Sequence, residues 1–202
     1  GVAADTELVD ITVNDGGNQA PVLAAIGTQN VTEGGNLNLA VSATDPDGTD
    51  PALTIENEPA NVTFTDNGDG TGTFDFNPDY TQAGSYIVRF IASDGTAADT
   101  ELVNIIVAEA GNQTPVLATI GAQSVTEGAN LNLAISASDP DGTTPILTAE
   151  DVPTNATFSD NGDGTGTFDF NPDYTQAGVF TVDFIVTDGV DADTDQVQIT
   201  VT

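Results

Sequence analysis

Apolar and polar residues alternate along short segments of the chain. Within residues 71–76, Phe74 and Phe76 fall on one side and the polar residues between them on the other. This period of two predicts a β-strand with one buried face. Residues 67–70 precede it with an Asn-Gly and an Asp-Gly pair, which favour a tight turn because they accept positive φ. Together these residues predict a β-hairpin.

Similar segments recur every ~8–12 residues, with turn residues between them, which is typical of a β-sandwich. No segment shows a sustained helical period. An all-β fold of two tandem Greek-key β-sandwiches is therefore predicted. In the first copy the expected strands are 22–26 with 31–32 as its offset continuation, 37–43, 52–56, 62–65, 71–76, one around Tyr86, Val88 and Phe90, and one around Val103, Ile105 and Val107.

The strand pattern occurs twice because the sequence contains a tandem duplication. Residues 66–84 return unchanged at 160–178, and roughly two-thirds of the positions in the two copies match at this offset of 94 residues. Residues 1–9 also resemble residues 95–103. The predicted organisation is residues 1–17 as the last strand and linker of a preceding repeat, 18–110 as repeat 1 and 111–202 as repeat 2. The chain is thus expected to be a piece of a longer protein.

Composition narrows the range of functions. The 202 residues include 32 acidic side chains and a single basic one, Arg89, for a formal charge of −31. This charge argues against nucleic acid and anionic membranes as partners, and no apolar run is long enough for membrane insertion. The chain has no Cys, His or Lys, and therefore none of the common nucleophile–base pairs. We expect no enzymatic activity.

Several motifs resemble a known group of repeats. They are Asn-Gln-x-Pro-Val-Leu, Val-Thr-Glu-Gly, Ala-x-Asp-Pro-Asp-Gly, Ala-Gly-x-Tyr-x-Val, and Asp-Gly before the last strand. In this combination the chain resembles the tandem immunoglobulin-like and cadherin-like repeats of large bacterial surface or secreted proteins. The resemblance implies an immunoglobulin-like or cadherin-like sandwich and an extracellular or cell-surface location. It also extends to the tyrosine corner of immunoglobulin domains at Tyr86, where the second copy has Phe180.

The acidic turns are expected to gather at the ends of the sandwiches, because successive loops alternate between the two ends. Carboxylates that converge at a joint need a cation, and calcium accepts about six to eight oxygen ligands in irregular geometry. The cadherin resemblance places calcium ligands at Glu33, Asp139, Asp141 and Asp188. The candidate ligands at the junction are Glu33, Asp79, Glu109, Asn112, Asp139, Asp141 and Asp188, and those at the start of repeat 1 are Asp15, Asn18, Asp45, Asp47 and Asp94. The alternative is that these acids form plain turns on a surface adapted to salt.

Three functional hypotheses follow. The first is a stalk or adhesin segment that contacts neighbouring repeats and is stiffened by calcium at the joints. The second is a self-assembling filament subunit, in which Gly1 to Val13 forms a strand that pairs with another copy of the chain. The third is a polysaccharide-binding accessory module, with Tyr80 and Tyr174 as contacts, although a tyrosine at such a corner more often packs locally.

Overall fold

The computed structural model describes residue 1, residues 3–12 and residues 16–202. These residues form two compact units, contain sixteen strands and include no helix. The strands make four sheets of four strands each, two in each repeat. The prediction of two tandem β-sandwiches is confirmed. Because there is no helix in the described part of the chain, none is long and apolar enough to cross a membrane.

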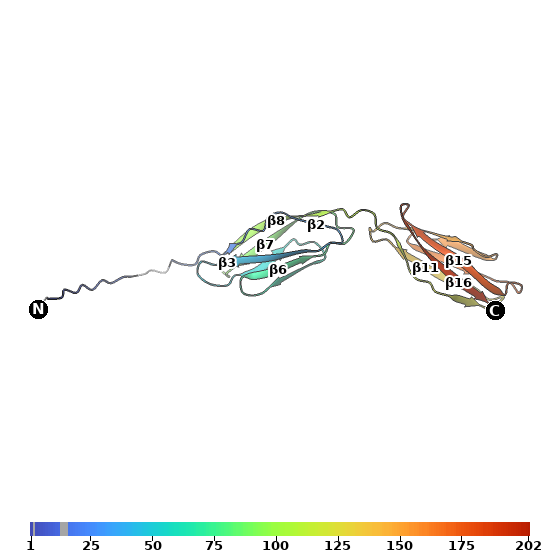
Figure 1. Ribbon diagram of the computed structural model, residues 1–202, viewed down its shortest axis with the longest axis horizontal. Helices are drawn as coiled ribbons and strands as arrows, with labels where there is room; N and C mark the ends of the chain where they lie inside the picture. The colour runs from blue at the N-terminus through green and yellow to red at the C-terminus, as the bar shows by residue number, and fades with distance from the viewer. Residues whose placement is uncertain (2, 13–15) are drawn as a thin grey trace. The chain divides into compact units, whose positions relative to one another are not determined.

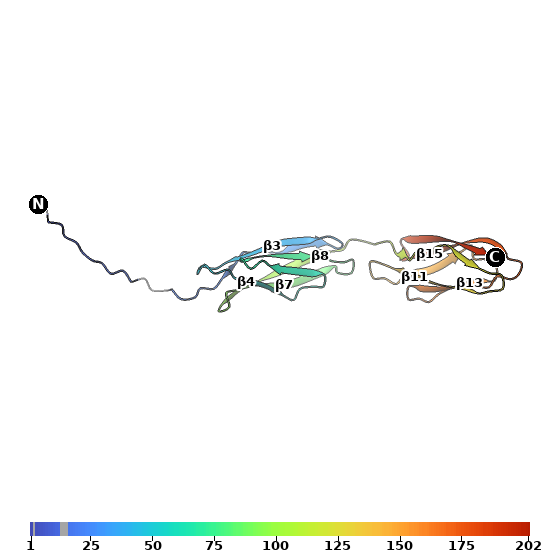
Figure 2. The ribbon, with the colours of Figure 1, turned by 90° about the horizontal axis from the view of Figure 1, so that it is seen from below.

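The first sandwich pairs two sheets across one core. Its sheets have the strand orders β1-β3-β6-β5 and β2-β8-β7-β4. Figures 1 and 2 show these strands running along the length of the repeat. The strands are β1 (Val22–Leu23), β2 (Gln29–Thr32), β3 (Leu37–Thr44), β4 (Ala52–Glu56), β5 (Val62–Asp66), β6 (Thr71–Phe76), β7 (Gly84–Ser93) and β8 (Ala98–Ala108).

The second sandwich repeats this arrangement. Its sheets have the orders β13-β14-β11-β9 and β10-β16-β15-β12. The long strands β11, β15 and β16 are labelled in Figure 1. The strands are β9 (Val116–Leu117), β10 (Gln123–Val125), β11 (Leu131–Ser138), β12 (Ile146–Glu150), β13 (Ala156–Asp160), β14 (Thr165–Phe170), β15 (Gly178–Thr187) and β16 (Ala192–Val201).

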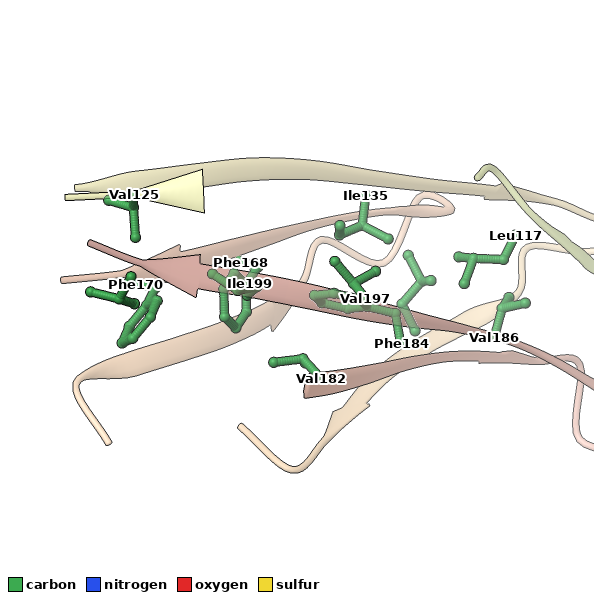
Figure 3. Packing of buried hydrophobic residues seen from close by; sticks show 12 residues of the cluster. Leu117, Val125, Ile135, Phe168, Phe170, Val182, Phe184, Val186, Val197 and Ile199 are labelled. Carbon is green, nitrogen blue, oxygen red and sulfur yellow. The ribbon is translucent and has the colours of Figure 1, made fainter. Parts of the chain in front are cut away.

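The core of each sandwich is built from the faces that the alternation predicted. In repeat 2, Phe168 of β14 and Phe184 of β15 come from opposite sheets, and their ring centroids are 5.4 Å apart. Figure 3 shows both rings pointing between the sheets with Ile135, Val197 and their neighbours. Such edge-to-face pairs add to the stabilisation from burial. In this core a Cβ atom at Gly166 would lie 2.7 Å from the ring of Phe158, so a larger residue there would have to displace that ring.

The first predicted strand, 22–26, is shorter than expected. Only Val22 and Leu23 pair with β3, and the chain then crosses to the other sheet, where β2 pairs with β8. The carboxylates of Asp99 and Glu101 on β8 accept the backbone N–H groups of Leu23 and Ile26. Ala24 still donates its N–H to the Ser42 carbonyl of β3 over 2.8 Å, whereas the N–H of Ile26 is satisfied by a side chain rather than by a strand partner.

The strand predicted for Gly1 to Val13 is not present. Residues 1 and 3–12 are in no strand, and Leu8, Val9 and Ile11 are exposed. Val13 lies outside the described residues. In repeat 1 the corresponding strand, β8, is held between β2 and β7, whereas residues 1 and 3–12 have no such neighbouring strands in the described part of the chain. A strand needs such neighbours to satisfy its backbone, so the local pattern alone does not form one.

Candidate functional site

The start of repeat 1 gathers several of the acidic residues that the sequence singled out. The Asn18 amide donates to Asp94 Oδ2 over 2.9 Å, and the backbone N–H of Gln19 donates to Asp47 Oδ2 over 2.5 Å. The N–H of Asp47 donates in turn to Asp45 Oδ1 over 2.8 Å. Asn18, Asp45, Asp47 and Asp94 therefore belong to one hydrogen-bonded end of the sandwich. Asp15, the fifth candidate there, lies outside the described residues.

The start of repeat 2 has the same arrangement. The N–H of Gln113 donates to Asp141 Oδ2 over 2.6 Å, and the N–H of Asp141 donates to Asp139 Oδ1 over 2.8 Å. The Asn112 amide donates to Asp188 Oδ2 over 2.9 Å and to Asp191 Oδ2 over 3.0 Å. Asp191 was missed by the sequence reasoning, because repeat 1 has Ala97 at this position.

Hydrogen bonding favours the charged form of two of these acids. The N–H of Ala97, the Asn18 amide and the N–H of Thr96 lower the pKa of Asp94. The N–H groups of Asp191 and Val190 and the Asn112 amide lower the pKa of Asp188 in the same way. A carboxylate that accepts several N–H groups is stabilised as the anion. These acids are thus held ionised by the turns they close.

At the other end of repeat 1, Glu33 is bound to the backbone. Its side chain is only 4% exposed. Oε1 accepts the N–H of Ala83, and Oε2 accepts the N–H of Ala110 over 3.4 Å. In repeat 2, Glu127 Oε1 accepts the N–H of Ala177 over 2.8 Å. This glutamate therefore connects the turn after β2 or β10 to the start of β7 or β15.

The remaining candidates at this end are more exposed. Asp79 Oδ1 accepts the N–H of Thr81 over 3.0 Å and its hydroxyl over 2.7 Å, so Asp79 closes the corner before β7. Glu109 is exposed after β8. The counterpart Asp173 closes the same corner in repeat 2, where the Thr175 hydroxyl and N–H lower its pKa. Each of these corner carboxylates has a local structural role.

The carboxylates alone do not form a metal cage. No three acidic side chains in the described part of the chain come close enough together to hold an ion. Most of the oxygens discussed above already accept hydrogen bonds from backbone groups. Two that the structure buries without a hydrogen-bond partner are Asp45 Oδ2 and Asp141 Oδ1, at the starts of the two repeats. Calcium binding at the domain ends stays a prediction. These two oxygens are the candidate ligands whose substitution can test it.

Acids on the last strand of each repeat have a role that the sequence reasoning missed. Glu101 accepts the N–H of Ile26 over 2.9 Å and that of Gly27 over 3.0 Å. Asp195 accepts the N–H of Ile120 over 2.8 Å. The available signal was the recurrence of two acids spaced by two residues, Asp99 and Glu101 in β8 and Asp193 and Asp195 in β16. In both repeats these acids hold the segment that crosses between the sheets.

The two corner tyrosines lie against glycines. A Cβ atom at Gly34 would come within 2.7 Å of the Tyr80 ring, and one at Gly128 within 2.8 Å of the Tyr174 ring. Each tyrosine thus packs on the turn of its own repeat, although Tyr174 remains 82% exposed. At the site that resembles a tyrosine corner, the Tyr86 ring packs edge-on against Phe76, as Phe180 does against Phe170. These rings therefore extend the core.

Two surface hollows lie at equivalent places in the two repeats, and both are small. One beside β9 and β11 has a volume of about 220 Å³ and is lined by Val116, Ala118, Ser136, Ala137 and Ser138. The equivalent hollow in repeat 1, beside β1 and β3, has a volume of about 130 Å³. Both are below the roughly 300–1,000 Å³ of typical small-molecule sites. Their linings offer hydroxyl and apolar groups without an adjacent base.

Comparison with known proteins gives one family match across both repeats. The sequence model of a family described as bacterial Ig domain matches residues 18–106 and, a second time, residues 112–202. Chitinase A of Pseudoalteromonas piscicida is 29% identical in an alignment 142 residues long that covers 65% of this chain. The match spans only 16% of that relative's length.

Among solved structures, similar folds occur in proteins of different kinds. An endo-fucoidan hydrolase from glycoside hydrolase family 107 aligns with a TM-score of 0.49 at 19% identity, over 94% of this chain and 29% of its own. The titin domains Z1Z2 in complex with telethonin align with a TM-score of 0.40 at 15% identity, over 92% of this chain and 98% of theirs. At these identities the likeness concerns the fold alone.

Proposed function

Because this chain belongs to the bacterial Ig domain family, we propose that it is a non-catalytic spacer segment of a large extracellular protein. Two sandwiches follow one another along the chain, and acids such as Asp139 and Asp188 accept backbone N–H groups of their own turns. The absence of Cys, His and Lys from the sequence supports a role without acid–base or nucleophilic chemistry. The high acidic charge suits an extracellular, cation-containing medium.

The observation that carries this proposal is the pairing of the second and last strands of each sandwich. In repeat 2, β10 and β16 run parallel, with Gln123, Ser124 and Val125 opposite Ile199, Thr200 and Val201. The N–H of Thr202 donates to the Val125 carbonyl over 3.0 Å, and that of Glu127 donates to the Thr202 carbonyl over 2.9 Å. In repeat 1, β2 and β8 are likewise neighbours.

This pairing suits a segment that carries tension. Pulling the second sandwich by its two ends draws the parallel strands β10 and β16 past each other along their length. Their hydrogen bonds are then loaded together rather than one after another. The sandwich accordingly resists opening without any disulfide, which a chain lacking Cys could not form. A spacer between a surface and a distant domain needs this resistance.

Single-molecule force spectroscopy tests the proposal. Stretching the chain is expected to give two unfolding events, each releasing roughly 30 nm of chain before the folded length is subtracted. Glu127→Pro removes the N–H that donates to Thr202 and is expected to lower the unfolding force of one event. Glu127→Ala is the matched control, because it keeps the N–H and removes only the side chain. Equal unfolding forces for the two variants would reject the argument that the hydrogen bonds between β10 and β16 resist the pull.

We further propose that calcium binds at the joints between repeats and stiffens the spacer. The support for this is the pair of buried carboxylate oxygens without hydrogen-bond partners, Asp45 Oδ2 and Asp141 Oδ1. A cation shared with acids of an adjoining repeat would satisfy them and stiffen the joint. Asp141→Asn is expected to remove a calcium-binding event in calorimetry, whereas Asp163→Asn, in a hairpin turn, is not. X-ray scattering profiles that are identical with calcium and with chelator would refute the stiffening.

A second candidate is an accessory module of a polysaccharide-degrading enzyme. The observation that favours it is the similarity to part of Chitinase A. The exposed ring of Tyr174 is the aromatic group best placed to stack on a sugar. Gel electrophoresis with soluble chitin derivatives or fucoidan tests this candidate. Retardation that is lost in Tyr174→Ala and kept in Tyr86→Phe would support it, and migration unaffected by either polysaccharide would exclude it.

A further inference from the structure

Each repeat carries one Asn-Gly pair in an exposed turn. Asn67-Gly68 lies between β5 and β6, and Asn161-Gly162 lies between β13 and β14. No other asparagine of the sequence precedes a glycine. All four residues are exposed, and a Cβ atom at Gly68 or Gly162 would meet nothing within 4 Å. The backbone nitrogen after each asparagine thus belongs to a residue without a side chain and lies at the surface.

An Asn-Gly pair can lose its side-chain amide without an enzyme. The nitrogen of Gly68 gives its proton to water and attacks Cγ of Asn67, the bond from Cγ to Nδ2 breaks, and ammonia leaves. Water then opens the succinimide ring at one of its two carbonyl carbons, which leaves aspartate or isoaspartate. The net change is one water taken up and one ammonia released. The reaction requires that the glycine nitrogen loses its proton and that the asparagine amide turns toward it.

The folded turn of repeat 1 holds both reacting groups. Asp66 Oδ1 accepts the N–H of Gly68 over 3.0 Å, and a proton held by a carboxylate is harder to remove. The Asn67 amide donates to the Thr71 hydroxyl over 2.9 Å, so it cannot turn toward Gly68 without breaking this contact. The Thr71 hydroxyl donates in turn to Asp69 Oδ1 over 2.5 Å. The hydroxyl and the N–H of Thr71 lower the pKa of Asp69, which keeps this acceptor ionised.

The turn of repeat 2 holds the same groups in the same way. Asp160 Oδ1 accepts the N–H of Gly162 over 3.0 Å, and the Asn161 amide donates to the Thr165 hydroxyl over 2.9 Å. The backbone N–H of Asn161 also donates to the Thr165 carbonyl over 2.9 Å. Each turn therefore serves as the internal reference for the other.

We propose that Asn67 and Asn161 are deamidation sites that the folded turns protect. Opening a hairpin releases the glycine nitrogen and the asparagine amide together. In repeat 1 the conversion then adds a carboxylate beside Asp66 and Asp69 and, as isoaspartate, an extra methylene in the backbone of the turn. Like charges and a lengthened turn both oppose closing of the hairpin. The modification thus marks a repeat that has been open, an inference that goes beyond the spacer function.

Peptide mass spectrometry of the intact chain after incubation in mildly alkaline buffer tests the proposal. Residues 66–84 and 160–178 are identical, so the peptides must retain Thr65 or Ser159 to distinguish the repeats. The mass gained from amide to acid identifies deamidation, because isomerisation of the Asp-Gly pairs leaves the mass unchanged. Both sites are expected to react on the order of 10–100-fold faster in guanidinium chloride than in the folded chain, since unfolding removes both hydrogen bonds. Equal rates in the folded and unfolded chains overturn the proposal.

Thr71→Val tests the amide contact in one repeat while the other repeat stays unchanged. The variant removes the hydroxyl but keeps a β-branched side chain that suits the start of a strand. Deamidation of Asn67 is expected to rise roughly 3–10-fold, and that of Asn161 is expected to stay the same. Thr71→Ser keeps the hydroxyl and is expected to react like the wild type. Thr73→Val makes the same exchange further along β6 and is expected to change neither rate.

The comparison is made on variants that keep both thermal transitions. Thr165→Val makes the reciprocal test at Asn161 and replaces Thr71→Val if that variant loses a transition. If the valine variant of either turn reacts at its own asparagine no faster than Thr73→Val does, the threonine hydroxyl does not protect the site and the proposal is wrong. Neither rate enters the force measurement, so this inference and the spacer function fail independently.

Discussion

Replacing Glu101 by alanine is expected to destabilise repeat 1 by about 2 kcal/mol, because two backbone N–H groups lose their acceptor. Glu101 accepts from the half-buried N–H of Ile26 over 2.9 Å and from the exposed N–H of Gly27 over 3.0 Å. A half-buried donor left without a partner costs about 1–2 kcal/mol. The exposed donor of Gly27 adds a fraction of that, since water can replace the carboxylate.

The duplication provides matched comparisons for this substitution. In repeat 2 the equivalent residue is Asp195, which accepts a hydrogen bond from the N–H of Ile120 alone. Asp195→Ala is therefore expected to cost about 1 kcal/mol. Glu7 occupies the equivalent position in the exposed segment before repeat 1, and Glu7→Ala is expected to stay within about 0.5 kcal/mol of the wild type.

Differential scanning calorimetry measures all three variants. For a domain of this size, 1 kcal/mol shifts the melting temperature by roughly 4–8 °C, so Glu101→Ala is expected to lower one transition by roughly 8–16 °C. The other transition should not move. Glu101→Gln keeps one acceptor oxygen and is expected to fall between the wild type and Glu101→Ala. If Glu101→Ala is no more harmful than Glu7→Ala, the carboxylate does not hold the crossing segment and the reasoning is refuted.

Three further predictions concern the ends and the core. Phe168→Ala is expected to destabilise repeat 2 by about 3–5 kcal/mol in urea unfolding, because it empties the centre of the core; a loss below 1 kcal/mol would contradict the packing in Figure 3. Gly128→Ala is expected to destabilise repeat 2 more than an exposed Gly162→Ala, because its Cβ would meet the Tyr174 ring; equal melting temperatures would contradict that contact. The lowered pKa values of Asp94 and Asp188 mean that their stabilisation is present above the unfolded value of about 3.9 and is lost as pH falls further. Thermal unfolding between pH 6 and pH 2.5 should show this loss, and Asp188→Asn should reduce it in repeat 2.

The strands and the buried faces could be predicted because their causes are local. Apolar and polar residues alternate within residues 71–76, which form a single strand. The turn that precedes them is specified by the adjacent residues 67–70. The structure places Phe74 and Phe76 in the core and Thr73 and Asp75 on the other side, as the alternation requires. The strand predictions failed where strand formation depended on a neighbouring strand. Residues 24–26 were predicted as strand, but the N–H of Ile26 goes to the Glu101 side chain instead of to a strand. Residues 1 and 3–12 have no strand beside them.

The candidate site was predicted in part. Spacing and turn chemistry grouped Asp45 with Asp47 and Asp139 with Asp141, because each pair closes one local turn. The duplication placed Asn18 and Asn112 with these acids. The backbone roles of Glu33 and Glu101 could not be read in the same way. Their partners lie 50 and 75 residues away along the chain, at positions that only the stacking of the two sheets brings near.

The sequence by itself determined the period of 94 residues, the all-β class, the inward faces and the excess of carboxylates. The period follows from comparing the two copies, and the other three depend on residue type or on spacing within a few positions. Tertiary structure alone decided which backbone N–H each carboxylate receives and which apolar side chains remain outside. Those outcomes depend on distant segments meeting across the sandwich, and neither alternation nor composition contains that information.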